Sequence, residues 1–211
     1  DPGSYVEFDG HDITNKPAHE ISALGLSRTF QLLRLYQDMS VINNVMSGYH
    51  TKVPYSLLDS VLGRKKIWEY EKKIKEEMME LLSFVGLADY AEMNANELSG
   101  GQRRLLVLAR AIAGKPKLLM LDEPAAGLSP VNLDNLMKII IQLKEKFGLT
   151  LIIIEHILKV VMNTCNRVTV LDYGQKIAEG TPTEVKSDNA VIEAYLGKKM
   201  NDDEMRKALA G

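Results

Sequence analysis

The chain has 211 residues, of which 45% are hydrophobic and 26% are charged, and this balance predicts a packed globular protein. The formal net charge is −2 with acidic and basic residues interleaved, which argues against free nucleic acid as a partner. One cysteine excludes an internal disulfide and favours a reducing, cytoplasmic compartment. No purely apolar run approaches the ~20 residues of a membrane span, so membrane association is expected only through a partner.

The first part of the chain is turn-rich and then becomes helical. Residues 5–13 alternate and turn at Asp9-Gly10, which predicts a hairpin. From residue 17 to about Gly86 the pattern is predominantly helical, most clearly over residues 67–86. Apolar residues recur there at helical steps: Ile67, Ile74, Met78, Leu81 and Val85. Gly86 is placed to end this helix.

The second half alternates strands with helices. Three short apolar segments bounded by turn residues predict strands buried on both faces: 117–122, 149–154 and 167–172. Between the first two, Ser129, Pro130 and Gly148 mark the beginning and end of a helix. This order predicts a parallel sheet with right-handed crossovers. A hairpin over residues 172–180 and a helix capped at Thr181 are expected to follow.

Polar side chains follow two of the predicted strands. Asp122 and Glu123 end the first strand, and because adjacent residues of an extended chain point to opposite sides, they can divide two tasks. Asp122 can hold Mg²⁺ or its water, while Glu123 can face an attacking water. His156 ends the next strand and can bond a terminal phosphate oxygen. The spacing alone equally allows a solvated strand end and a structural histidine.

The stretch "NELSGGQRRLLVLARA", residues 96–111, places two glycines at the beginning of a helix. Ser99 is positioned to cap that helix, and Gly100 and Gly101 allow a ligand to approach the backbone N–H groups. Free amides at a helix N-terminus attract anions, so a phosphate is the expected guest. On its own, this turn would favour an ordinary serine cap with a flexible start.

Five motifs in order make the chain resemble the ATP-binding cassette (ABC) ATPases. They are the "RTFQ" that ends at Gln31, "LSGGQ" at 98–102, "LLMLDEP" at 118–124, "GLSP" at 127–130 and "EH" at 155–156. The segments "VLDYGQKIAEGTP" and "VIEAYLG" further resemble the ATPases of branched-chain amino acid importers. The resemblance implies an α/β fold like that of P-loop NTPases, with a parallel-sheet core lobe and an inserted helical lobe.

The same resemblance implies a division of the chain and a set of partners. Residues 1–31 and 114–197 would form the α/β core, residues 32–113 the helical signature subdomain, and residues 198–211 a charged tail. Two such subunits, as a homodimer or a heterodimer, would enclose ATP between them. The helical lobe would contact a membrane permease, which places the chain at the cytoplasmic face of the cell membrane.

Roles for individual residues are also implied by the motifs. For catalysis, Glu123 would activate water, His156 would contact the γ-phosphate, and Gln31 would join the metal to the helical lobe. Asp122 would assist Mg²⁺. The nucleotide on the partner subunit would be contacted by residues of the signature and of the turn that follows "LDEP": Ser99, Gly100 and Gly101, with Gln102 as support, and Ser129.

One element of the family is missing from the 211 residues. They contain no G-x-x-x-x-G-K-[ST] phosphate loop, and the chain opens on the turn residues "DPGS". We therefore expect that a segment carrying this loop precedes Asp1 and that the chain alone is inactive. The complete protein is expected to be the ATP-hydrolysing subunit of an importer. Alternatives are a lipid-type or soluble cassette ATPase, or a non-catalytic interaction module.

Overall fold

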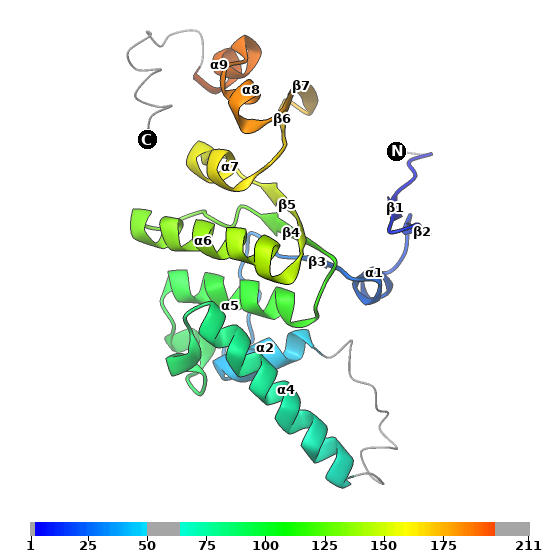
Figure 1. Cartoon of the computed structure of the whole chain (residues 1–211), viewed down its shortest axis with the longest axis vertical. Helices are drawn as coiled ribbons and strands as arrows, with labels where there is room; N and C mark the ends of the chain where they lie inside the picture. The colour runs from blue at the N-terminus through cyan, green and yellow to red at the C-terminus, as the bar shows by residue number, and fades with distance from the viewer. Residues whose placement is uncertain (1–2, 50–63, 197–211) are drawn as a thin grey trace.

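The computed structural model describes residues 3–49 and 64–196. Its helices are α1 (Ala18–Leu24), α2 (Val41–Gly48), α4 (Arg64–Phe84), α5 (Gly100–Ala113), α6 (Pro130–Phe147), α7 (Leu158–Thr164), α8 (Pro182–Lys186) and α9 (Asn189–Leu196), with 3₁₀ turns η2 (Ala88–Tyr90) and η3 (Ala95–Glu97). Its strands are β1 (Glu7–Phe8), β2 (His11–Asp12), β3 (Leu26–Arg28), β4 (Leu118–Asp122), β5 (Thr150–Ile154), β6 (Val168–Asp172) and β7 (Gln175–Gly180). Along the long axis, α2, α4 and α5 lie at one end, β3, β4, β5 and α6 in the middle, and β6 to α9 at the other end (Figure 1).

The central sheet has the order β3-β4-β5, and both pairings are parallel. Helix α6 connects β4 to β5, so the predicted order of strand, helix and parallel strand is confirmed. Strand β3 lies inside the stretch that the sequence pattern predicted to be helical. Gly25 is the reason, because its left-handed backbone (φ 105°) ends α1, and Leu26 then pairs with Leu118.

The expectation that all three apolar strands are buried on both faces is wrong for the described residues. On one face of β5, Leu151 and Ile153 pack against the core, whereas Ile152 and Ile154 on the other face are 45% and 56% exposed. Strand β6 does not pair with the parallel sheet and instead forms an antiparallel pair with β7. The apolar pattern therefore predicted the strands correctly but not what covers them.

Local capping signals placed the helices well. Ser129 accepts the N–H of Asn132, Pro130 occupies the first turn of α6, and Gly148 (φ 62°) ends it, as the sequence predicted. The predicted stripe is buried at Ile74, Met78 and Leu81 of α4 and at Val85 just after it, whereas the side chain of Ile67 lies outside the described residues. The hairpin at Asp9-Gly10 is also confirmed, with φ values of 50° and 77°. The expected tail, residues 198–211, lies outside the described residues.

Close packing of α2 on α5 fixes the helical part of the molecule. Val41, Ile42 and Val45 of α2 are buried in the same core as Leu106 and Ala109 of α5. At the end of α2 the two backbones approach so closely that a Cβ built on Gly48 would overlap the carbonyl oxygen of Arg110. A glycine is therefore required at position 48 by contact and not by backbone conformation. Among the described residues, no helix combines the length and apolar character that crossing a bilayer requires.

Replacing Gly48 with alanine tests this contact. We expect Gly48→Ala to lower the free energy of unfolding by about 1–3 kcal/mol, because the added methyl group must push α2 away from α5. Urea denaturation measures the change. Gly100→Ala is the matched control, since a Cβ on this other helical glycine meets nothing within 4 Å. Equal stability of both variants would contradict the close approach.

Candidate functional site

Three side chains meet where the parallel strands end. Gln31 follows β3, Glu123 follows β4, and His156 follows β5. The Nε2 of Gln31 donates to Oε2 of Glu123 at 2.6 Å, and Nδ1 of His156 lies 3.8 Å from Oε1 of the same carboxylate. Since the carboxyl ends of adjacent parallel strands share one edge, residues 92 positions apart become neighbours. Glu123 is the centre of this cluster.

The two adjacent carboxylates have different partners. Asp122 stays in β4, and its Oδ2 accepts a hydrogen bond from Nη2 of Arg28 at 2.8 Å. Glu123 leaves the strand with a left-handed backbone, at φ 45°. The two carboxylates have different partners, but the turn at Glu123, and not the extended alternation that the sequence predicted, directs its carboxylate to Gln31 and His156.

Two charged residues that the sequence analysis did not single out hold this turn. Nη1 of Arg104, on α5, donates to the backbone carbonyls of Glu123 and Pro124 at 2.9 and 3.1 Å. Burial lowers the pKa of the Arg104 guanidinium below its usual value. The nearby carboxylates of Glu155 and Glu123 act in the opposite direction but do not outweigh burial. The Glu155 side chain is fully buried and accepts the N–H of Ala125. In the sequence, only position indicated a role for these two residues. Arg104 lies beside the signature, and Glu155 directly precedes His156.

The signature turn forms a separate group at the beginning of α5. Ser99 is the N-cap, as predicted, and its hydroxyl accepts the N–H of Gln102, while the Gln102 side chain accepts the N–H of Ser99. This reciprocal pair satisfies two backbone donors and fixes the turn. Ser99 and Gly100 are exposed, and a Cβ on Gly100 would meet no other atom within 4 Å. The turn is thus ordered and open.

The beginning of α6 lies against the same turn. A Cβ on Gly101 would come within 2.9 Å of Nδ2 of Asn132, so the two helix starts are in close contact. Ser129 caps α6 and is itself exposed. The structure therefore brings Ser129 and the signature turn to one region, through Gly101 and Asn132.

Asn44 fixes the segment that follows Gln31. Its side chain is fully buried in α2, and its Nδ2 donates to the carbonyls of Tyr36, Met39 and Ser40 at 3.0, 3.2 and 3.1 Å. Its Oδ1 accepts the N–H of Tyr36 at 3.0 Å. One amide thus organises the loop between β3 and α2, a role without any signal in the sequence pattern.

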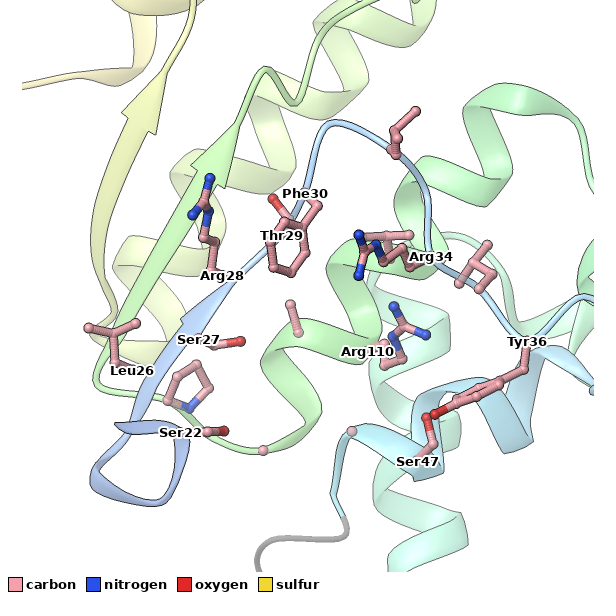
Figure 2. Close-up of a pocket in the computed structure, with 17 residues that line it drawn as sticks. Ser22, Leu26, Ser27, Arg28, Thr29, Phe30, Arg34, Tyr36, Ser47 and Arg110 are labelled. Atoms are coloured by element: carbon pink, nitrogen blue, oxygen red, sulfur yellow. The ribbon is translucent and has the colours of Figure 1, made fainter. Parts of the chain in front are cut away.

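A pocket of about 650 Å³ opens beside this loop, between β3, α2 and α5. Figure 2 shows Phe30 between Arg28 and Arg34, with Tyr36 and Arg110 farther along the wall. The two guanidinium groups lie 5.0 and 5.3 Å from the centre of the Phe30 ring. Phe30 remains 48% exposed and Tyr36 56% exposed. The wall therefore combines aromatic surface with positive charge, a mixture suited to a protein contact.

Comparison with known proteins decides the family. The model of the family described as "ABC transporter" matches residues 2–126, and that of "Branched-chain amino acid ATP-binding cassette transporter" matches residues 175–199. This chain belongs to the ABC transporter ATPases. The high-affinity branched-chain amino acid transport ATP-binding protein BraF of Pseudomonas aeruginosa is 34% identical over 196 residues, covering 93% of this chain and 77% of BraF.

Other ABC relatives agree. The probable branched-chain amino acid transport ATP-binding protein LivG of Archaeoglobus fulgidus is 38% identical over 203 residues, covering 94% of this chain and 76% of LivG. A solved nucleotide-free ATP-binding cassette from an ABC transporter superposes with a TM-score of 0.74 at 35% identity, covering 92% of this chain and 77% of the other. An ABC transporter cassette in its ADP conformation gives 0.73 at 34% identity, with the same coverage. The expected family and the α/β cassette fold are confirmed.

Asn44 offers a test of how this ABC domain holds its Gln31 loop. We expect Asn44→Asp to lower the free energy of unfolding by about 2–3 kcal/mol, because three backbone carbonyls lose their donor and face a carboxylate that is itself buried. Urea denaturation measures it. Asn43→Asp is the control, since Asn43 is the exposed neighbour on the same helix. A similar, small effect at both positions would contradict the assigned hydrogen bonds.

Proposed function

We propose that this ABC ATPase is the energy-coupling, ATP-hydrolysing subunit of an importer for branched-chain or other hydrophobic amino acids. The observation that carries the proposal is the contact of Gln31, Glu123 and His156 at the ends of three neighbouring strands. The names of the relatives BraF and LivG support the substrate class. A non-catalytic module would have no need for a carboxylate and an imidazole held at this place.

Within this cluster we assign the roles that the motifs imply. Glu123 orients and activates the attacking water, since its carboxylate is 30% exposed and lies at the open edge of the sheet. His156 contacts the γ-phosphate and stabilises the charge that develops during transfer. Gln31 joins this cluster to the helical region, because the loop that follows it is held by Asn44 of α2.

Mg²⁺ would be held by Asp122 and Gln31. Within residues 3–49 and 64–196, no group of three or more His, Cys, Asp or Glu side chains is arranged to hold a metal ion alone. One carboxylate and one amide oxygen nevertheless fit Mg²⁺, which usually binds few protein ligands and completes its shell with phosphates and water. When bound, the ion neutralises charge on the phosphate oxygens. Arg28 already holds Oδ2 of Asp122 and so fixes this carboxylate in the site.

The open signature turn supports a dimer, either of two identical chains or of two related ones. Ser99, Gly100 and Gly101 would contact the γ-phosphate bound on the opposite subunit, with Gln102 fixing the turn. Ser129, at the adjacent start of α6, would face the same interface. In this assignment the exposed backbone of the turn serves a ligand that another chain holds.

The pocket beside Phe30 supports a membrane partner. We take residues 32–113 as the helical lobe and residues 1–31 and 114–197 as the core, so the pocket lies where the two join. An apolar loop of a permease subunit would enter it against Phe30 and Tyr36 and would sense movement of the Gln31 segment. The chain would then sit at the cytoplasmic face of the membrane. Dependence of turnover on this partner would separate a transporter from a soluble cassette.

ATP binding is proposed to require a phosphate loop outside these 211 residues. The exposed Ile152 and Ile154 support this, because parallel sheets are normally covered on both faces. Within the described residues, β5 is also an edge strand of its sheet. A segment that adds a strand beside β5 and a helix over its open face would complete the sheet and could carry the loop.

The chain of 211 residues should therefore bind ATP weakly. A helix N-terminus contributes about 0.3–1 kcal/mol, up to ~2 when partly buried, and one charge-assisted hydrogen bond about 1.5–3 kcal/mol. Their sum barely reaches the ~4 kcal/mol of a millimolar dissociation constant. Isothermal titration calorimetry and phosphate release are expected to show no micromolar binding and negligible turnover. Micromolar affinity or sustained hydrolysis would contradict the requirement for a further segment.

In the ATPase that includes the upstream segment, Glu123→Gln tests the catalytic assignment. Glutamine preserves the size of the side chain but cannot act as a base, so kcat is expected to fall about 10²-fold or more while ATP binding is retained. Phosphate release and nucleotide titration measure the two quantities. Glu145→Gln, at an exposed position of α6, is the matched control. Unchanged turnover in Glu123→Gln would remove Glu123 from this role.

A further inference from the structure

Glu155 is a buried acid with an unusual set of partners. It follows β5 directly, and its side chain is 0% exposed. Oε2 accepts the N–H of Ala125 at 3.1 Å, and Oε1 accepts the N–H groups of His156 and Ile157 at 3.0 and 3.2 Å. Nδ1 of His156 lies 3.4 Å from the same Oε1. A buried charge needs such partners, since without them its desolvation is strongly unfavourable.

These contacts connect the ends of two strands. Ala125 belongs to the turn that begins at Glu123, while His156 and Ile157 belong to the segment after β5. The main chain reinforces the connection, because the N–H of Glu123 donates to the carbonyl of Ile154 at 2.9 Å. The two side chains that face the substrate in the proposed function therefore share one anchor behind them.

The turn at Glu123 requires this support. A left-handed backbone costs a non-glycine residue about 1–2 kcal/mol, and it persists where surrounding contacts determine it. Here Arg104 holds the carbonyls of Glu123 and Pro124 from one side, and Glu155 holds the N–H of Ala125 from the other. With both contacts in place, the Glu123 carboxylate stays within reach of Gln31 and His156.

We propose that Glu155 is a positioning residue of the hydrolytic site, which acts through Glu123 and His156 and does not touch ATP. The proposal rests on the proposed function, since it assigns Glu155 a role in that reaction. By accepting the N–H groups of His156 and Ile157, Glu155 fixes the main chain that carries the imidazole. By holding Ala125, it fixes the direction of the Glu123 carboxylate.

A carboxylate is required at position 155 because both oxygens act as acceptors. In Glu155→Gln one oxygen is replaced by an NH₂ group, which would face either the N–H of Ala125 or the N–H groups of His156 and Ile157. Either orientation places donors against each other and shifts one of the two strand ends. A misplacement of about 1 Å near reacting groups lowers rates by about 10²-fold.

The first experiment compares kcat and KM in the ATPase that includes the upstream segment. Glu155→Gln is expected to lower kcat about 10-fold to 100-fold while KM for ATP changes less than about twofold, since ATP is not contacted. Leu143→Ala, a fully buried position of α6, is the control for lost stability alone. A kcat for Glu155→Gln equal to that of the wild type, or of Leu143→Ala, would overturn the proposal.

A double variant separates action through His156 from an independent effect. If Glu155 acts through its neighbours, Glu155→Gln combined with His156→Ala should lose less activity than the product of the two single losses. Fully multiplicative losses would overturn the proposed mechanism. If Glu123→Gln and His156→Ala themselves leave turnover unchanged, the proposed function fails, and this outcome is distinct from failure of the Glu155 proposal.

A spectroscopic experiment on the 211-residue chain does not depend on activity. In hydrogen exchange followed by NMR, the backbone amides of Ala125, His156 and Ile157 are expected to exchange slowly in the wild type, because they donate to a buried carboxylate. Glu155→Gln should make at least one of them exchange faster. Rapid exchange at all three amides in the wild type would overturn the proposal even if no substitution at position 155 folds.

Discussion

The left-handed backbone of Glu123 is the constraint on which the site depends. Strand β4 delivers Asp122 and Glu123 together, and the turn between them sends one carboxylate to Arg28 and the other to Gln31 and His156. Without that turn, an extended chain would direct them to opposite faces of the sheet. The sheet thus supplies proximity through its parallel register, and the turn supplies direction. Backbone hydrogen bonds fix the register, and the side chains of Arg104 and Glu155 fix the turn through its backbone groups.

Helix α5 links the two parts of the machinery within one rigid element. Its first turn is the signature, its second turn carries Arg104 to the Glu123 carbonyl, and its last turn meets Gly48 of α2. Fourteen residues of α-helix span about 21 Å, so this one helix extends from the signature turn to the contact with α2. Through Asn44, α2 in turn holds the loop after Gln31. Helix α5, the turn at Glu123, the loop after Gln31 and helix α2 are therefore each in contact with the next, and α2 is in contact with α5.

Features with a local cause could be predicted from the sequence, and features with a distant cause could not. The sequence predicted α6 from Ser129, Pro130 and Gly148, because capping depends on the residues at the helix ends. The three-residue strand β3 was missed because only its pairing with β4 defines it. Likewise, the apolar pattern of β5 could not tell which face is covered. Glu123 and His156 followed from motifs, whereas Arg104 and Glu155 act through partners far away in the sequence.

The two glycines of the signature show how the structure separates causes that the sequence combines. The motif attributes both to the approach of a phosphate. Gly101 has a neighbour within this chain, because a Cβ added there would lie 2.9 Å from Nδ2 of Asn132 on α6, whose side chain would have to shift. Gly100 meets no such neighbour and is exposed, so packing within this chain does not require glycine there. Of the two positions, Gly100 is thus the one at which no contact within the described residues accounts for a glycine.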